Sequence, residues 1–163
     1  MTLTVGSGPL AGRAQDRRNF TLQGPEHSLI LEDYPQRLRA VIAGRVVLDS
    51  TRASILHETG HQIVPYVPVE DIDAALLRRS RTTTYCPFKG DAWYWSLRID
   101  ERVVEDALWA YEAPLDSAPW LAGLAALKWD VADEWFVEDE VAFGLENLAV
   151  PPAFETRSGT RAT

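Results

Sequence analysis

Most of the middle of the chain alternates apolar and polar residues or carries short apolar runs that end at turn residues. A period of two places successive side chains on opposite faces of a strand, so this pattern favours strands over helices. Such runs occupy residues 38–43, 46–48, 54–56, 63–67, 83–88, 93–99 and 104–112. Gly44 and Thr59-Gly60 lie at turn positions between them, and we expect the first two runs to pair as a hairpin.

Two segments have a pattern that suits helices better. After Pro68, acidic residues lie in the first turn at 70–73, Ile72 and Leu76 share one face, and arginines at 78–79 close the segment. A helical turn is expected around residues 116–121. We expect a last hairpin to pair residues 124–129 with 135–138 across 130–133. Together these elements predict a mostly β fold, a meandering antiparallel sheet with one or two short helices at its edge.

Composition changes at both ends of the chain, where Gly, Ser, Pro, Ala and Arg are frequent. We therefore interpret residues 1–25 as an N-terminal arm, 26–145 as a single domain and 146–163 as a C-terminal tail. A chain of about this length buries roughly 70% of its extended surface, enough for one good core. Hydrophobic residues make up 46% of the sequence and charged residues 25%, which is ordinary for a globular protein.

Charge and cysteine usage exclude several classes of protein. The formal net charge of -8 repels phosphate backbones and anionic lipids, so we expect neither nucleic acid nor a membrane as partner. The sequence lacks an apolar run of about 18 residues, and its N-terminus lacks a basic region followed by an apolar stretch. Cys86 is the only cysteine, so no intrachain disulfide can form. We expect a protein of the reducing cytoplasm.

The segment His57-Glu58-Thr59-Gly60-His61 matches the H-E-x-x-H pattern of zinc proteases. That chemistry requires a helix, which places both histidines on one face, and a third ligand. Glycine costs a helix about 1 kcal/mol relative to alanine, Pro65 follows shortly after, and the only other histidine is His27. We expect a strand and a turn here, with His57 and Glu58 on opposite sides, and keep a zinc hydrolase as the third hypothesis for function.

Residues 82–90 form the most informative stretch and end in Cys86-Pro87-Phe88-Lys89-Gly90. Proline fixes φ and glycine can adopt a positive φ, so the loop is expected to be rigid while its backbone can approach a ligand closely. A nearby cation or base would make Cys86 nucleophilic, and Lys89 or His57 are candidates. The alternative is an inert thiol in the core.

Many of these residues together resemble a known family, from about Glu26 to Glu140. They are Val46-Val47-Leu48-Asp49-Ser50, Arg52, Leu56, Glu58-Thr59-Gly60-His61, Tyr66-Val67-Pro68, Asp71, Thr84, Cys86-Pro87-Phe88-Lys89-Gly90, Ala92-Trp93-Tyr94-Trp95 and Trp109-Ala110-Tyr111-Glu112-Ala113-Pro114. The chain resembles the bacterial and fungal domain-of-unknown-function 427 family. The resemblance implies a β-tent, in which two antiparallel sheets lean together over a ligand cleft. Many β-tent relatives hold a zinc ion with two C-x-x-C pairs, which this sequence lacks, so we expect no structural zinc.

The family also carries a nucleotidyltransferase-like label. Nucleotidyl transfer needs a Gly-Ser helix start and carboxylates that hold Mg²⁺. Here residues 5–8 supply a Gly-Ser fragment in the predicted arm, and Asp71 and Asp73 lie two positions apart in a predicted helix, where they face apart. We do not expect that activity.

Aromatic and charged residues supply the remaining candidates. Trp109 and Tyr111 share one face of their predicted strand and could form a wall for a ligand, or belong to the core. The candidate ligand-binding residues are Tyr66, Tyr94, Trp109, Tyr111, Arg52 and Asp49. Glu58 and Glu112 are also expected near the cleft. The alternative for Arg52 is an ion pair with Asp49 or Glu58.

The leading hypothesis is a small-molecule site in the cleft between the sheets. The protein would be a metal-independent enzyme of unassigned reaction, with Cys86, Lys89 and Glu58 as catalytic residues and with no metal or cofactor. The alternative is a non-catalytic interaction or dimerisation module that uses an exposed, Trp-rich surface. Trp120, Trp129 and Trp135 are its candidates, and a homodimer is a possible assembly.

Overall fold

The computed structural model describes residues 27–148. The predicted arm at 1–25 lies outside these residues, and so does the predicted tail from residue 149 on. The strands are β1 (Leu29–Tyr34), β2 (Leu38–Ile42), β3 (Arg45–Ser50), β4 (Ala53–Glu58), β5 (Val64–Pro68), β6 (Leu77–Cys86), β7 (Gly90–Ile99), β8 (Arg102–Ala110), β9 (Leu124–Leu127), β10 (Glu134–Val137) and β11 (Glu140–Ala142). The 3-10 helices are η1 (Val69–Asp71), η2 (Ala74–Leu76), η3 (Pro119–Leu121), η4 (Trp129–Val131) and η5 (Leu145–Leu148).

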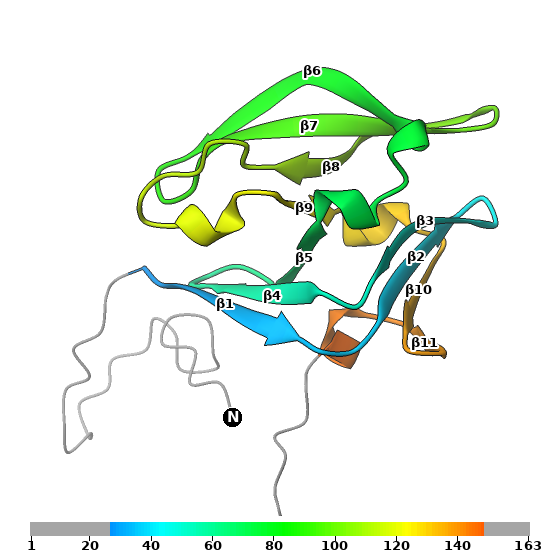
Figure 1. Cartoon of the computed structure of the whole chain (residues 1–163), viewed down its shortest axis with the longest axis horizontal. Helices are drawn as coiled ribbons and strands as arrows, with labels where there is room; N and C mark the ends of the chain where they lie inside the picture. The colour runs from blue at the N-terminus through cyan, green and yellow to red at the C-terminus, as the bar shows by residue number, and fades with distance from the viewer. Residues whose placement is uncertain (1–26, 149–163) are drawn as a thin grey trace, which may run out of the picture.

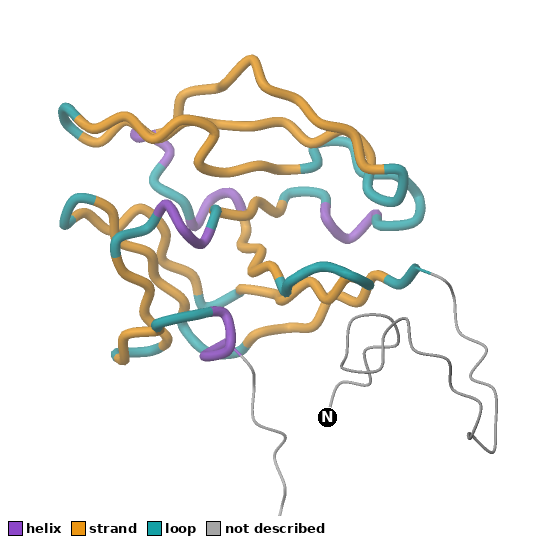
Figure 2. The backbone as a smooth tube through the Cα atoms, turned by 180° about the vertical axis from the view of Figure 1, so that it is seen from behind, coloured by secondary structure: helices purple, strands orange, loops and turns teal. Residues whose placement is uncertain are grey.

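The strands form two antiparallel sheets, which confirms the predicted mostly β fold. The larger sheet has the order β1-β4-β5-β9-β8-β7-β6, and the smaller has the order β11-β10-β2-β3. Figure 1 shows that the larger sheet is strongly curled, with β6, β7 and β8 above, β1 and β4 below, and β5 and β9 between them. The smaller sheet stands at one end of the curl. Figure 2 shows the same layers from behind, with short helical turns between the upper and lower strands.

The short strand β9 joins the two halves of the larger sheet. Val67 of β5 pairs with Ala125, and Leu108 of β8 pairs with Leu127. The prediction that residues 124–129 form a hairpin with 135–138 was therefore wrong. After β9 the chain passes through η4 into the other sheet, where β10 pairs with β2 and β11. Burial drives this change of sheet, because Ala125 and Leu127 are enclosed in the larger sheet and Trp135 in the smaller.

The helix predicted after Pro68 is also wrong, because two separate 3-10 turns, η1 and η2, stand in its place. Between them the backbone is extended at Ile72, which forms a bridge with Leu48 of β3. The Asp73 N–H donates to the Val47 carbonyl oxygen at 3.0 Å. Pairing with β3 and burial of Ile72 thus outweigh the local helical pattern. The predicted turn at 116–121 is present as η3.

Two hydrophobic clusters fill the molecule. The larger includes Leu38, Leu97, Ile99 and Trp135 and contains residues of both sheets. The smaller is built around Leu56, Tyr66, Ala92, Tyr111, Ala118, Leu121 and Ala126, which come from the larger sheet and from the segment around η3. Since its strands belong to the upper and lower parts of the curl, this second cluster holds the curled sheet together from inside.

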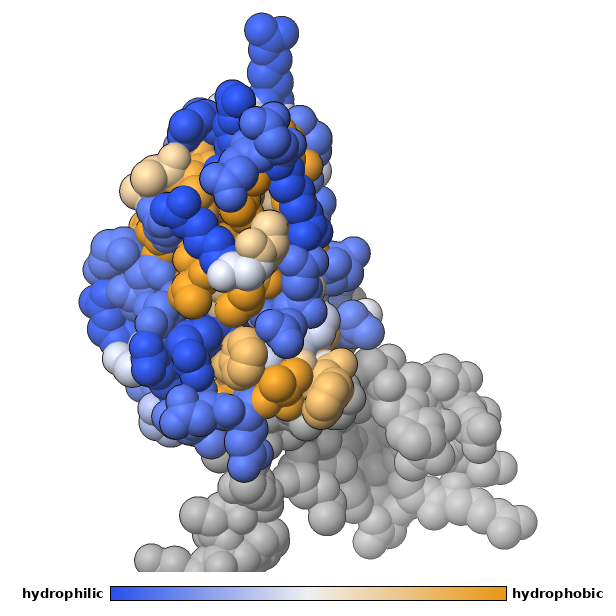
Figure 3. Space-filling view, turned by 90° about the vertical axis from the view of Figure 1, so that its right-hand side faces the viewer, coloured by the Kyte–Doolittle hydropathy of each residue, from blue (hydrophilic) through white to orange (hydrophobic). Residues whose placement is uncertain are grey.

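The surface at the right of Figure 1 differs from its surroundings in polarity. Figure 3 views this side directly and shows apolar residues gathered in a central band that polar residues border. No helix within residues 27–148 has the length and apolar character required to cross a bilayer.

Candidate functional site

A cleft of about 710 Å³ opens beside the smaller hydrophobic cluster, inside the curl of the larger sheet. Its volume falls within the roughly 300–1,000 Å³ that is usual for small-molecule sites. The cleft is lined by residues of β4, β5, β6, β7 and β8, by the turn between β6 and β7, and by the segments before β1 and after β4 and β8. The lining residues are His27, Leu56, Glu58, Gly60, His61, Gln62, Val64, Tyr66, Tyr85, Cys86, Pro87, Phe88, Lys89, Tyr94, Trp109 and Tyr111.

The cleft contains a buried ion pair. Glu58 is the last residue of β4, Lys89 lies in the β6–β7 turn, and their exposed fractions are 8% and 7%. Lys89 Nζ donates to Glu58 Oε2, and His27 Nε2 lies 3.1 Å from Glu58 Oε1. Burial of either charge alone would cost several kcal/mol, so removal of one partner would leave the other without compensation inside the protein. Because the two residues come from opposite parts of the curl, the pair also connects them across the cleft.

The loop that presents Lys89 is fixed on several sides. Gly90 has a φ of +102°, as the sequence allowed. The Leu115 N–H donates to the Lys89 carbonyl oxygen at 3.0 Å, and Ser117 Oγ donates to the Phe88 carbonyl oxygen at 2.7 Å. On the other side, the His27 ring stacks on Phe88 with centroids 3.7 Å apart. The Lys89 side chain therefore projects into the cleft from a rigid turn.

The four aromatic side chains that the sequence indicated, Tyr66, Tyr94, Trp109 and Tyr111, all line the cleft. Trp109 Nε1 donates to the Tyr66 hydroxyl oxygen at 3.1 Å, and the two rings meet edge to face. Tyr94 lies 6.4 Å from Trp109 between ring centroids. Burial raises the pKa of Tyr66 and of Tyr111 well above the usual value, so both phenols stay protonated at neutral pH.

Cys86 lies beside this wall. It is half-buried, it packs against the smaller cluster, and it lines the cleft. The structure thus brings Glu58, Cys86 and Lys89, the three predicted catalytic residues, to one cavity. Whether the thiol reacts or serves as packing stays a prediction.

Asp49 and Arg52, which the sequence suggested for the cleft, do not line it. Asp49 lies on the exposed face of β3 in the smaller sheet, where it accepts from Arg37 Nε at 2.7 Å. Arg52 donates to Asp71 at 2.6 Å and to Glu70 at 3.2 Å, so neither pairing predicted for Arg52 forms. Asp49 belongs to β3 of the smaller sheet, and Arg52 lies in the turn between β3 and β4, so neither comes from a segment that lines the cleft.

Glu112 also lies outside the cleft, where it is exposed and accepts from Arg79 at 2.7 Å. His27 and Phe88 are cleft residues that the sequence reasoning did not single out. Their stacking joins residues 61 positions apart, which no local pattern signals.

The H-E-x-x-H segment adopts the strand and turn that we expected. His57 is in β4 and lies 3.1 Å from Glu32 Oε2, whereas the next side chain, Glu58, points to the opposite face and into the cleft. His61 is exposed in the turn that follows. The helix that would place both histidines on one face is absent from this segment. Among residues 27–148, no group of three His, Cys, Asp or Glu side chains could hold a metal ion.

The three tryptophans proposed for an exposed surface differ in burial. Trp135 is only 3% exposed, and its ring stacks on Trp129 with centroids 4.5 Å apart. Trp129 and Trp120 are half-buried, and Trp120 packs against the smaller cluster. Trp135 is therefore part of the core, and an interaction surface that includes Trp120 and Trp129 stays a prediction. A homodimer formed through this or another surface stays a prediction, which light scattering would test.

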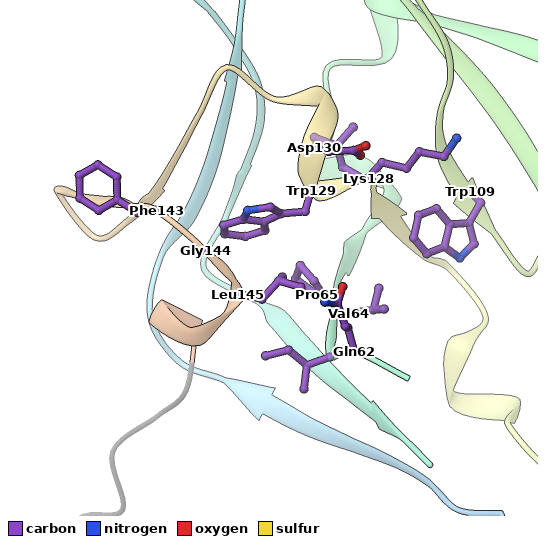
Figure 4. Close-up of a pocket in the computed structure, with 12 residues that line it drawn as sticks. Gln62, Val64, Pro65, Trp109, Lys128, Trp129, Asp130, Phe143, Gly144 and Leu145 are labelled. Carbon is purple, nitrogen blue, oxygen red and sulfur yellow. The ribbon is translucent and has the colours of Figure 1, made fainter. Parts of the chain in front are cut away.

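A second hollow adjoins the cleft. It measures about 610 Å³ and shares Gln62, Val64 and Trp109 with the cleft. Figure 4 shows Trp109 and Lys128 on one side of it and Trp129 and Phe143 toward the other. Lys128 Nζ lies 5.8 Å from the centroid of the Tyr94 ring. The two hollows are therefore neighbours that share Trp109 as a lining residue.

Comparison with known proteins agrees with this fold and with the resemblance seen in the sequence. A family model described as Domain of unknown function (DUF427) matches residues 30–138, well over half of the chain. The chain belongs to the DUF427 family. The matched region contains every residue that lines the cleft except His27. A search of curated proteins found no match. Since the DUF427 description states no activity, the function must be argued from the cleft itself.

Proposed function

We propose that this DUF427 domain binds a small molecule in the cleft inside the curled sheet and acts on it by metal-independent acid–base chemistry. The observation that carries the proposal is the buried Glu58–Lys89 pair on the wall of an otherwise aromatic cavity. A carboxylate and an ammonium group in contact form a proton acceptor and a proton donor held side by side. A ligand that enters the cleft meets both groups away from bulk water, where electrostatic interactions are stronger.

A purely structural role for the ion pair is the competing explanation. Apolar residues of similar volume often stabilise a protein as well as a buried ion pair does. What favours function is the position of the pair, because both residues line a cavity of ligand size instead of being enclosed by the core. Cys86 lies three residues before Lys89 on the same turn and adds a third polar group to this wall.

A metabolite screen followed by substitution tests the proposal. Binding would be detected by ligand-observed NMR and any turnover by mass spectrometry, first with the unchanged protein. Lys89→Arg keeps the charge but not the shape of the ammonium group, and Cys86→Ala removes the thiol. We expect at least one of these variants to weaken binding or turnover about tenfold or more.

Arg37→Met is the matched control, because it removes one partner of the exposed Arg37–Asp49 pair far from the cleft. This variant should leave the binding and turnover of every ligand found in the screen unchanged. If neither cleft variant alters the binding or turnover of any hit, the site assignment is wrong.

A further inference from the structure

The cleft offers hydrogen-bond donors to a ligand, and the Tyr66 hydroxyl is one of them. Its oxygen already accepts from Trp109 Nε1 at 3.1 Å, while its own proton is retained because burial, and then the neighbouring Tyr111, raise its pKa. A neutral phenol that has accepted one hydrogen bond has its O–H left to give. Tyr111, whose pKa burial also raises, presents a second protonated hydroxyl to the same cavity.

The one carboxylate among the described residues that line the cleft is already engaged. It belongs to Glu58. Its Oε2 accepts from Lys89, and its Oε1 faces His27 Nε2 at 3.1 Å. A ligand that needs a negative partner would have to displace one of these groups from a buried charge, which is unfavourable.

Two aromatic rings of the cleft already lie beside cations. Lys89 Nζ lies 5.9 Å from the centroid of the Tyr111 ring, and Lys128 Nζ lies 5.8 Å from that of Tyr94. These are the only two lysines of the chain. A cation is attracted to the face of an aromatic ring within about 6 Å of its centre. Here the protein's own ammonium groups supply that attraction, and they repel a second cation.

We infer that the cleft selects a flat aromatic ligand that carries a hydrogen-bond-accepting oxygen, as in a carbonyl or carboxylate group, and that it rejects aromatic cations. The ring would lie against Trp109, and the oxygen would accept from the Tyr66 hydroxyl. This inference rests on the proposed function, because it specifies the chemistry of a ligand for the same cleft.

Three probes with the same ring test the inference: 2-acetylnaphthalene, 2-naphthoate and 2-naphthylmethylammonium. Their dissociation constants would be measured at pH 7 by titration calorimetry or ligand-observed NMR. We expect both acceptor probes to bind at least about tenfold more tightly than the ammonium probe. The ketone and the carboxylate differ in charge, so their relative affinity tells whether the natural ligand class is neutral or anionic.

Substitution of the donor gives a second readout. Tyr66→Phe should weaken both acceptor probes about tenfold and leave the ammonium probe unchanged. Tyr34→Phe is the matched control, because Tyr34 is equally buried at 1% exposure but lies outside the cleft. Tyr111→Phe repeats the test at the second hydroxyl if Tyr66→Phe fails to fold.

Two results separate the inference from the proposed function. Equal or tighter binding of the ammonium probe, or acceptor affinities that neither tyrosine substitution changes, would overturn the inference and leave the cleft as a binding site. If none of the probes binds and the metabolite screen also gives no ligand, the proposed function fails, and the inference fails with it.

Discussion

At the scale of single residues, Glu58 and Lys89 form a buried ion pair. Each is less than a tenth exposed, and each has the other as its opposite charge. The loss of one partner leaves the other charge buried without compensation. The same two groups would then determine both the stability of the domain and the electrostatics of the cleft.

Replacement of Lys89 by methionine should lower the free energy of unfolding by about 3–5 kcal/mol, because Glu58 would remain buried without the ammonium group that pairs with it. The double variant Lys89→Met with Glu58→Gln should recover much of that loss. Urea denaturation at pH 7 measures both. As a control, Arg37→Met at the exposed Arg37–Asp49 pair should cost less than about 1 kcal/mol. If Lys89→Met and Arg37→Met lowered the free energy of unfolding equally, Glu58 and Lys89 would not depend on each other as a buried pair.

Tyr34 presents the opposite case, a buried hydroxyl that has no hydrogen-bond partner within the described residues. An unsatisfied buried polar group costs about 1–3 kcal/mol. Tyr34→Phe should therefore leave the free energy of unfolding unchanged or raise it by up to about 2 kcal/mol. Thermal denaturation checks this, and a clear loss of stability would reveal a partner for the hydroxyl.

The candidate site could be predicted from sequence where its residues are close along the chain or carry a distinct local pattern. Cys86 and Lys89 were found through the turn chemistry of Pro87 and Gly90, and Trp109 and Tyr66 through their strand positions. Asp49 and Arg52 were misplaced because their surroundings depend on which sheet β3 joins. That choice is made by pairing with residues distant in the sequence, which alternation alone does not encode.

At the scale of elements, the turn between β6 and β7 depends on Gly90. A Cβ atom at this position would lie 3.4 Å from Leu115 Cγ and 3.5 Å from the Ala113 carbonyl oxygen, and the φ of +102° disfavours any side chain. Gly123 makes a useful comparison, because it has a φ of +79° but a Cβ atom added there would have no neighbour within 4 Å among the described residues.

We predict that Gly90→Ala lowers the free energy of unfolding by about 1–3 kcal/mol, and by more than Gly123→Ala does. The reason is that the φ of +102° at Gly90 lies further from the left-handed region that other residues can reach, near about +57°, than the φ of +79° at Gly123 does. Denaturation curves of the two variants give the comparison. If Gly123→Ala were the more damaging of the two, this difference in backbone strain would have no energetic importance.

The local pattern predicted where strands lie in the sequence better than it predicted which strands pair with one another. The strands at 38–43, 46–48 and 93–99 follow from alternation and from the turn at Gly44, and they are present. The hairpin expected between 124–129 and 135–138 was plausible by spacing alone. It fails because the intervening residues 130–133 lead from one sheet to the other, and burial in two separate layers decides that route.

At the scale of the whole molecule, Asp133 connects the two sheets. Its carboxylate accepts from the Ala43 N–H at 2.6 Å, at the β2–β3 turn, and from Arg102 of β8 at 2.9 and 2.8 Å. The Ala43 N–H, followed by Arg102, holds the pKa of Asp133 below its usual value of 3.8. The ionised Asp133 side chain therefore links the β2–β3 hairpin of the smaller sheet to the β7–β8 hairpin of the larger sheet.

This lowered pKa predicts an acid-sensitive contact between the sheets. A carboxyl group whose pKa is lower in the folded state contributes stability above its unfolded pKa, near 4, and loses it as the pH falls through the folded value. Stability should therefore decline from about pH 4 downward. The Asp133→Asn variant should start less stable at pH 7 and decline less steeply. The urea concentration at the midpoint of unfolding would be measured for both proteins from pH 7 to pH 2.5. If stability fell equally steeply with pH in the two proteins, this role for Asp133 would be contradicted.

The position of β9 in the larger sheet has a consequence for how the protein is made. β5 and β8 lie on either side of β9 and are joined through its four residues, Leu124–Leu127. During synthesis, residues 64–68 and 102–110 leave the ribosome well before β9 does, and until then each half of the sheet has an unpaired edge. Such edges are sites of wrong pairing between chains. The nascent domain therefore stays vulnerable to aggregation until about residue 127 has emerged, and a chain shortened before that point would leave the sheet in two parts.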